Sequence, residues 1–341
     1  MLDHLEQLIR IDPAARGLIS SEAQWGPLAE GHLARACLDL AHRAQRVVLV
    51  TGFYIPLGNP PAAETDGPLG TALLADVLLR GGVEVDLLTD RCCAPALRVC
   101  AEATGVPIER VRTCPFPVHS DEPATVFEDW ERDFSHWAEQ AGVTHLIAIE
   151  RVGPSHTRES AWLQSGGADE VVREFDRRVP PEHAGHCHNM RGVAIDDFTA
   201  PLHRLFERWP ERIPGLQTMG VGDGANEIGM GSQRWDDLVR RLPGDHAGRV
   251  PCRVGCTWTV VCGVSNWGGY ALAAGFAQAR GRTDLLQRHT PESQQRVLAE
   301  LVCRGPAVDG VTRQPTATVD GLDWATYIEP WRRMREALRV S

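Results

Sequence analysis

The most constraining feature of this sequence is a series of short apolar runs that alternate with segments of helical periodicity. The clearest runs are residues 46–51 (RVVLVT), which is β-branched and nearly all apolar, and residues 144–150 (THLIAIE), and two more strands are expected at residues 83–89 and 216–221. Such runs are typical of strands that are buried on both faces. Helical segments are expected between and after them, at residues 68–80, 95–104, 267–280 and 291–302. This alternation predicts an α/β fold with a mostly parallel sheet and helices on both faces, in Rossmann-like layers.

The remaining segments complete the predicted organisation. Leu2, Leu5, Leu8 and Ile9 share one helical stripe and residues 33–41 carry a second, so residues 1–45 are interpreted as an N-terminal helical segment. Residues 46–341 then form one α/β domain, within which the polar segment 152–190 is either a sub-boundary or a long loop. Further helices are expected at residues 128–141, 168–177 and 235–242, and one or two strands at 250–261.

Composition excludes several classes of protein. Hydrophobic residues make up 43% and charged residues 23%, which allows a sizeable core and excludes global disorder. The net charge is -10, from 45 acidic and 35 basic residues, so neither nucleic acid nor an anionic membrane is expected as a partner. The ten cysteines show no CxxC spacing, and the N-terminus resembles no secretory leader. The expected compartment is therefore the reducing cytoplasm.

The loop between the first strand and its helix is the first candidate site. It is long and rich in Gly and Pro, and it delivers Glu64, Thr65 and Asp66 just before the helix that Pro68 opens. Loops longer than about 12–15 residues are usually functional or disordered. We expect Glu64 and Thr65 to bind substrate and Asp66 to be catalytic. The alternative is that Thr65 or Asp66 simply caps the helix.

A second glycine-rich segment, residues 220–231 (GVGDGANEIGMG), follows a predicted strand. It carries Asp223, Asn226 and Glu227. The two acids are four residues apart, so a helical turn would place both on one face. Paired carboxylates can divide acid and base roles, or hold a divalent cation such as Mn²⁺ or Mg²⁺. The alternative is a glycine-rich turn in which an aspartate caps a helix.

Two further segments carry polar groups suited to binding. In residues 189–192 (NMRG), Asn189 can orient a substrate and Arg191 can bind a carboxylate through two parallel hydrogen bonds. Ser265 and Asn266 follow a strand and open a helix, where helix capping or ligand binding is expected. Residues 308–322 are interpreted, taken alone, as an ordered connection.

The histidines before NMRG admit two interpretations. His183, His186 and His188 lie close together in the sequence, beside Cys187. Metal binding is one interpretation, but no second ligand pair with a recognised spacing follows. A surface histidine cluster is the favoured interpretation.

Taken together, seven segments resemble the D-glutamate cyclase family. They appear in the order VTGF (50–53), ETDGPLG (64–70), IERVG (149–153), NMRG (189–192), GVGDGANEIGMG (220–231), GVSNWGGYAL (263–272) and DGVTRQPTATVDGL (309–322). The resemblance covers nearly the whole chain but only the cyclase portion, without the extra N-terminal domain and mitochondrial presequence of animal relatives. The chain departs from the family at His186, Cys187 and His188, where the family tends to have aromatic residues. This departure bears on substrate preference.

The resemblance implies a lyase that converts D-glutamate to 5-oxo-D-proline and water, with residues 46–341 as its catalytic domain. Asp66, Asp223 and Glu227 would provide acid, base or metal-holding groups, with Arg191 on a carboxylate and the asparagines orienting substrate. A Mn²⁺ or Mg²⁺ ion, with Asp223 and Glu227 as candidate ligands, is compatible with the resemblance, and no organic cofactor is expected. The sequence is also compatible with a homo-oligomer.

Two alternative functions remain. The first is another lyase, or a lactam hydrolase, that acts on a small acidic amino acid. The second is a protein that binds an amino acid or nucleotide without turning it over. Several carboxylates on separate loops favour catalysis, because a receptor for an anion would not surround it with acids.

Overall fold

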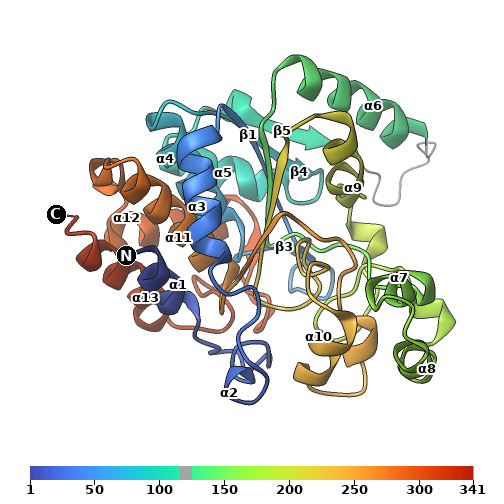
Figure 1. Cartoon of the computed structure of the whole chain (residues 1–341). Helices are drawn as coiled ribbons and strands as arrows, with labels where there is room; N and C mark the ends of the chain where they lie inside the picture. Colours follow the sequence, from blue (N-terminus) through green and yellow to red (C-terminus); the bar gives the residue numbers. More distant parts are fainter. Residues whose placement is uncertain (116–124, 341) are drawn as a thin grey trace.

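The computed structural model describes residues 1–115 and 125–340 (Figure 1). Its helices are α1 (Leu2–Ile9), α2 (Glu22–Trp25), α3 (His32–Arg43), α4 (Pro68–Arg80), α5 (Ala94–Thr104), α6 (Thr125–Gln140), α7 (Arg158–Gln164), α8 (Asp169–Arg178), α9 (His203–Arg212), α10 (Trp235–Arg241), α11 (Ser265–Ala279), α12 (Pro291–Arg304) and α13 (Trp324–Ala337). Its strands are β1 (Arg46–Thr51), β2 (Tyr54–Ile55), β3 (Ala62–Glu64), β4 (Glu84–Asp90), β5 (Val111–Cys114), β6 (His145–Ile149), β7 (Gln217–Gly222), β8 (Trp258–Val261) and β9 (Ala307–Val308).

Six of these strands form the main sheet, in the order β5-β4-β1-β6-β7-β8. Every neighbouring pair is parallel, which confirms the predicted parallel sheet. The strand order reverses between β1 and β6. In open α/β sheets, ligands bind beyond the carboxyl ends of the strands at such a reversal. The topology therefore directs attention to the residues that follow β1 and β6.

Helices cover both faces of the sheet, as the apolar strands require. Along β1, Val47 and Leu49 belong to one apolar core, whereas Val48 and Val50 belong to another. The first core also contains residues of α3, α4, α5 and α11, and the second contains residues of α6, α9 and α10. Figure 1 shows α4 and α11 on one side of the sheet and α6 and α9 on the other. The expected N-terminal helices are present as α1 and α3, and both pack on α11.

The structure differs from the sequence-based expectation at several elements. Strand β5 and helices α7, α9 and α13 were not expected. Within residues 250–261 only β8 is a strand, and the preceding residues make only isolated bridges, such as Ser155 with Cys252. The first three residues of α6 precede the expected start at 128.

A smaller sheet carries two of the loops that surround the candidate site. Strand β2 pairs antiparallel with β3, and β3 pairs parallel with β9. This arrangement holds the loop after β1 beside residues 309–322. Within residues 1–115 and 125–340, no helix is both long enough and apolar enough to cross a membrane.

Candidate active site

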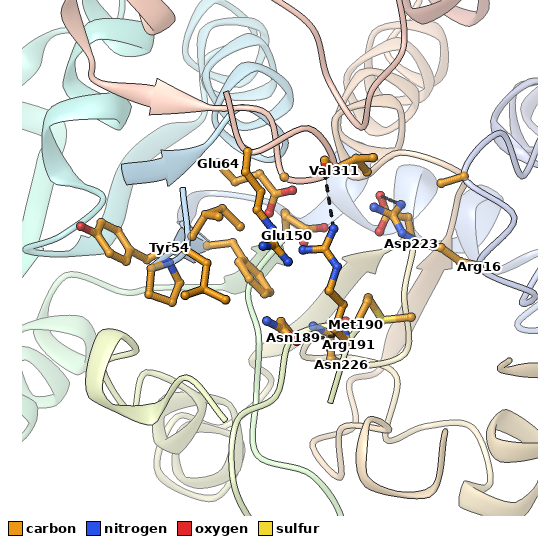
Figure 2. A pocket seen from close by; sticks show the side chains of 17 residues that line it. Arg16, Tyr54, Glu64, Glu150, Asn189, Met190, Arg191, Asp223, Asn226 and Val311 are labelled. Carbon is orange, nitrogen blue, oxygen red and sulfur yellow. Dashed lines mark hydrogen bonds and ion pairs between the residues drawn. The ribbon is translucent and has the colours of Figure 1, made fainter. Parts of the chain in front are cut away.

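A cavity of about 210 Å³ lies beyond the carboxyl ends of β1, β6 and β7. Five of the residues expected to form a site line it: Glu64, Asn189, Arg191, Asp223 and Asn226. Figure 2 shows Glu64 and Val311 on one side of the cavity and Asn189 and Asn226 on the other, with Glu150 between them. The other expected residues, Thr65, Asp66, Glu227, Ser265 and Asn266, are not among those that line the cavity.

Asp66 and Asn266 join two helix starts behind the cavity. Asp66 does not cap α4; its carboxylate accepts hydrogen bonds from the backbone N–H groups of Ser265 (2.8 Å) and Asn266 (2.7 Å) at the start of α11. In return, the Asn266 side-chain oxygen accepts hydrogen bonds from the N–H groups of Gly67 (3.0 Å) and Gly70 (2.7 Å) at the start of α4. A Cβ atom on Gly70 would lie 2.8 Å from the Asn266 Cα, so glycine permits this close approach.

Three buried carboxylates meet at this junction. Asp66, Glu150 and Asp223 each offer an oxygen atom, and these atoms all lie within 4.8 Å of one another. Glu150 directly follows β6 and has a φ of 47°, in the left-handed region that costs energy for a side chain other than glycine. Its Oε2 atom accepts a hydrogen bond of 2.6 Å from the Ser265 hydroxyl. Ser265 thus contacts all three carboxylates, Glu150 through its hydroxyl and Asp66 and Asp223 through its backbone N–H.

Burial and mutual repulsion favour the protonated forms of these acids. Burial first, and then neighbouring carboxylates, raise the pKa values of Asp66 and Glu150 well above their ordinary range. The pKa of Glu64 is raised in the same way, by burial and then by Asp320. Burial also raises the pKa of Asp223 to about 6, although the Arg16 guanidinium opposes this shift. Strongly perturbed carboxylates in a cavity are typical of sites that transfer protons.

Arg16 brings the N-terminal segment into the site. Its guanidinium lies 2.8 Å from a carboxylate oxygen of Asp223 and 2.8 Å from one of Asp320. The turn that carries Arg16 is closed by Asp12, whose carboxylate accepts hydrogen bonds from the N–H groups of Arg16 and Gly17, both at 2.9 Å. Arg16 is therefore a cation among the acids of the site that comes from outside the α/β sheet.

Asp223 and Glu227 do not share the face of a helical turn, as the sequence had suggested. Residues 223–226 form a bend, and the Glu227 side chain turns back into it. Its Oε1 atom accepts hydrogen bonds from the N–H groups of Asp223 (3.0 Å) and Gly224 (2.7 Å). Glu227 thus holds the backbone that positions Asp223. The Asp223 carboxylate in turn accepts a hydrogen bond of 3.1 Å from the Ser265 N–H.

The amide residues on the opposite wall have different roles. The Asn189 side-chain oxygen accepts hydrogen bonds from the N–H groups of Arg191 (2.9 Å) and Val193 (3.1 Å), so it shapes the NMRG turn. The Asn226 side-chain nitrogen donates to the His188 carbonyl at 2.9 Å. Its side-chain oxygen is buried and has no partner among the described residues, so it can accept a hydrogen bond from a ligand. Thr65 donates its hydroxyl to the Thr318 carbonyl at 2.9 Å and so links two loops.

The interpretation of the histidines as a surface cluster is wrong for His188. This ring is fully buried, with its centroid 5.6 Å from that of His183 and 6.4 Å from that of His186. Among the described residues, these rings do not form a group with metal-ligand spacing, whereas the carboxylates do.

Sequence reasoning missed several residues of the site. Glu150 and Arg16 line the cavity, and so does Arg313, which was placed in an ordered connection. Asp320 lies in that same connection and pairs with Arg16. The position of Glu150, an acid directly after a buried strand, was a usable signal.

Comparison with known proteins agrees with this site-bearing fold. A family model described as "D-glutamate cyclase-like, C-terminal" matches residues 5–169 and 171–335. The mitochondrial D-glutamate cyclase of Homo sapiens is 32% identical over 276 residues, an alignment that covers 79% of this chain and 37% of the human protein. The chain therefore aligns with little more than a third of that relative's length. By the extent of the family match and this identity, the chain belongs to the D-glutamate cyclase-like family.

Proposed function

We propose that this protein converts D-glutamate to 5-oxo-D-proline and water by intramolecular dehydration. The observation that carries the proposal is the group of buried carboxylates Asp66, Glu150 and Asp223, within 4.8 Å of one another beside a cavity. The printed name of the human relative, a D-glutamate cyclase, supports the same reaction.

The reaction sets three requirements: the amine must lose protons, the γ-carboxylate must lose its charge, and the departing oxygen must gain protons. The α-amine must attack the γ-carboxyl carbon, forming a C–N bond, while a C–O bond breaks and water leaves. The substrate ammonium gives up two protons, and the departing oxygen gains two, so no net proton is consumed. A five-membered ring brings the amine and the carboxyl together, but an ammonium is no nucleophile and a carboxylate is a poor electrophile. The site must therefore relay protons from nitrogen to oxygen.

The acids beside the cavity suit this relay. Glu150 lines the cavity, favours its protonated form and can donate a proton to the γ-carboxylate. Asp66, buried behind the cavity, also favours its protonated form. The pKa of Asp223, at about 6, suits a group that gains and loses a proton near neutral pH. Glu64 lines the cavity, where its side-chain oxygen can accept a hydrogen bond from the substrate amine. Arg191, at the cavity wall, binds a carboxylate of the substrate.

The same acids fit a divalent cation. Asp66, Glu150 and Asp223 offer only oxygen ligands. When ionised, these three acids carry more negative charge than the single positive charge of nearby Arg16 can neutralise. The proposal therefore assigns Mn²⁺ or Mg²⁺ to these three residues, in place of the expected pair Asp223 and Glu227. When bound, the ion would supply Lewis-acid polarisation of the γ-carboxylate. Its binding would displace protons, because a ligating carboxylate must be ionised.

A receptor without turnover is the less favoured function. D-Glutamate carries two carboxylates, and a pure receptor would gain nothing from buried acids with raised pKa values beside its ligand. Acids in this arrangement are instead suited to protonating a group that must react.

The test is turnover by the purified protein. D-Glutamate is incubated with the protein, with and without Mn²⁺, and 5-oxoproline is followed by chiral chromatography, with L-glutamate as the control substrate. We expect 5-oxo-D-proline from the D-isomer. The absence of product under both conditions, from protein that circular dichroism shows to be folded, would overturn the proposed reaction. Product that forms without added metal, in an amount that a chelator does not change, would indicate that the proton relay alone supports the reaction.

A further inference from the structure

Two arginines face the same cavity without carboxylate partners. Arg191 and Arg313 both line it, and their charges act on each other: burial, and then Arg313, lower the pKa of Arg191. Among residues 1–115 and 125–340, neither guanidinium forms an ion pair within 4 Å, and the Arg313 guanidinium has no hydrogen bond. Arg191 makes only a long hydrogen bond of 3.4 Å to the Val311 carbonyl, visible in Figure 2. Two adjacent cations with unused donors suit an anionic ligand.

The backbone of Arg313 is held in place by a built turn. Its φ is 60°, a left-handed conformation that persists only where the surroundings enforce it. Its N–H donates to the Asp309 carbonyl at 2.7 Å, and its carbonyl accepts from the Asn59 N–H at 2.9 Å. Arg313 is therefore anchored on both sides of its Cα, by the two loops that the small sheet brings together.

Asp309 organises the rest of this turn. Its side chain is fully buried, and its carboxylate accepts hydrogen bonds from the N–H groups of Val311 (2.9 Å), Thr312 (2.8 Å) and Gly321 (2.7 Å). These three bonds are satisfied within the loop. Asp309 therefore shapes the turn, and Arg313 remains free to bind a ligand.

The two carboxylates of the substrate differ in what the reaction asks of them. The γ-carboxylate is the group that reacts and must lose its charge. Paired guanidiniums would instead keep a carboxylate ionised and unreactive. The α-carboxylate does not react and stays ionised throughout, so it belongs beside the arginines.

We propose that Arg191 and Arg313 form a two-arginine clamp for the substrate α-carboxylate, and that this clamp selects amino acids with a second, distal carboxylate placed to reach the buried acids. The clamp rests on the proposed function for the identity of the substrate. Arg313 is the residue that this inference adds to the site.

Two unreactive ligands test the clamp apart from turnover. Glutarate is D-glutamate without its amine, and butyrate lacks one carboxylate as well, so neither can form the lactam. Calorimetric titration compares the wild type with Arg313→Gln and with a control, Arg296→Gln, which removes an exposed arginine of α12. We expect Arg313→Gln to bind both ligands about 10- to 100-fold more weakly than the wild type and the control do, the range of a charge-assisted contact, because each ligand has a carboxylate for the clamp.

A kinetic measurement gives the second readout. Arg313→Gln should raise KM for D-glutamate by about the same factor while kcat changes little, because the clamp holds ground state and transition state alike. Arg313→Lys, which keeps the charge but not the planar fork, should fall between Arg313→Gln and the wild type. It also replaces Arg313→Gln as the test if that variant does not fold.

The outcomes separate the clamp from the reaction. Arg313-dependent binding of glutarate, with a wild type that makes no 5-oxoproline, keeps the clamp and rejects the proposed reaction. Normal cyclisation by a folded Arg313→Gln variant with an unchanged KM, or equal binding of glutarate to both proteins, overturns the clamp and leaves the reaction standing.

Discussion

Two arginines at the same end of the sheet, Arg151 fully buried and Arg16 partly exposed, have opposite surroundings. Arg151 donates to one carboxylate, that of Asp90 at 2.7 Å, and to the carbonyls of Gly52 (2.8 Å) and Ala200 (2.7 Å). This group is neutral, with one acid for one base. Arg16 instead pairs with both Asp223 and Asp320, and further buried acids lie nearby. One arrangement balances its charges, and the other leaves an excess of acids.

This difference separates a structural role from a chemical one. Balanced charges hold loops together, as Arg151 does between residues 52, 90 and 200. Unbalanced acids have raised pKa values and carry protons or attract cations. Glu150 and Arg151 are neighbours in the sequence, yet their side chains enter different groups. The left-handed φ of Glu150, 47°, accompanies this divergence.

The largest expected effect is on the stability of the balanced pair. Asp90→Asn leaves the Arg151 charge buried without a counter-ion, so we expect a loss of about 3–5 kcal/mol in the free energy of unfolding. Urea unfolding followed by circular dichroism measures the loss. The double variant Asp90→Asn/Arg151→Met has no buried charge and should recover much of it. Equal stability of the single and double variants would show that the pair does not act as a neutral unit.

The next effect concerns the cation of the unbalanced group. Arg16 lowers the pKa of Asp223, so Arg16→Gln should raise that pKa further above about 6 and leave Asp223 more protonated at neutral pH. We expect kcat/KM for D-glutamate to fall by about 100-fold, within the range for a proton-transfer group. The acidic limb of the pH profile should move to higher pH.

A control variant lies in the same N-terminal segment. Arg10 pairs with Glu6 and Glu22, away from the cavity, so Arg10→Gln should leave the pH profile in place. An unmoved acidic limb in Arg16→Gln would contradict the role assigned to Arg16.

A third buried group sharpens the contrast through the sign of its pH dependence. Burial lowers the pKa of His156 from 6.5 to about 4, so the folded state prefers the neutral ring. The unfolded state binds more protons below pH 6.5, and the contribution of His156 to stability is therefore complete above that pH and is lost as the pH falls towards 4. The buried acids with raised pKa values act in the opposite sense and lose stability as the pH rises.

The histidine effect can be isolated by substitution. Between pH 7 and pH 5, the wild type should lose about 2 kcal/mol more unfolding free energy than His156→Gln, by proton linkage. Urea unfolding at both pH values measures this difference, with the exposed His136→Gln as the control. An equal loss in wild type and His156→Gln would mean that the ring is not held neutral.

The main sheet was predictable because its inner strands are buried on both faces. Strands β1 and β6 are therefore almost continuously apolar, and they were recognised together with β4 and β7. Strand β5 lies at the sheet edge, where partly exposed Arg112 and Thr113 interrupt the pattern. Helix α9 was missed because a proline, Pro210, lies within it and five of its ten residues are charged. An apolar run in the sequence therefore identifies a strand that is buried on both faces more readily than a strand at the edge of a sheet.

The site was predictable where its residues lie in glycine-rich loops. Glu64 and Asp223 were found in this way, Arg191 was found in the segment NMRG, and all three line the cavity. Arg16 could not be found, because its partners Asp223 and Asp320 lie in distant parts of the chain and only the folded topology brings the three together. Sequence reasoning identified the loops of the site but not the charges that those loops share.

The unbalanced carboxylates are expected to carry out the chemistry, and the variant Glu150→Gln isolates their contribution. Glutamine keeps the size of Glu150 and an oxygen acceptor for the Ser265 hydroxyl but cannot transfer a proton as an acid. The matched control is Glu6→Gln, because burial also raises the pKa of Glu6, which lies outside the cavity. We expect Glu150→Gln to unfold at or above the wild-type temperature and to form 5-oxo-D-proline about 10²- to 10⁴-fold more slowly, with Glu6→Gln retaining wild-type kcat. Wild-type turnover by a folded Glu150→Gln variant would contradict the account.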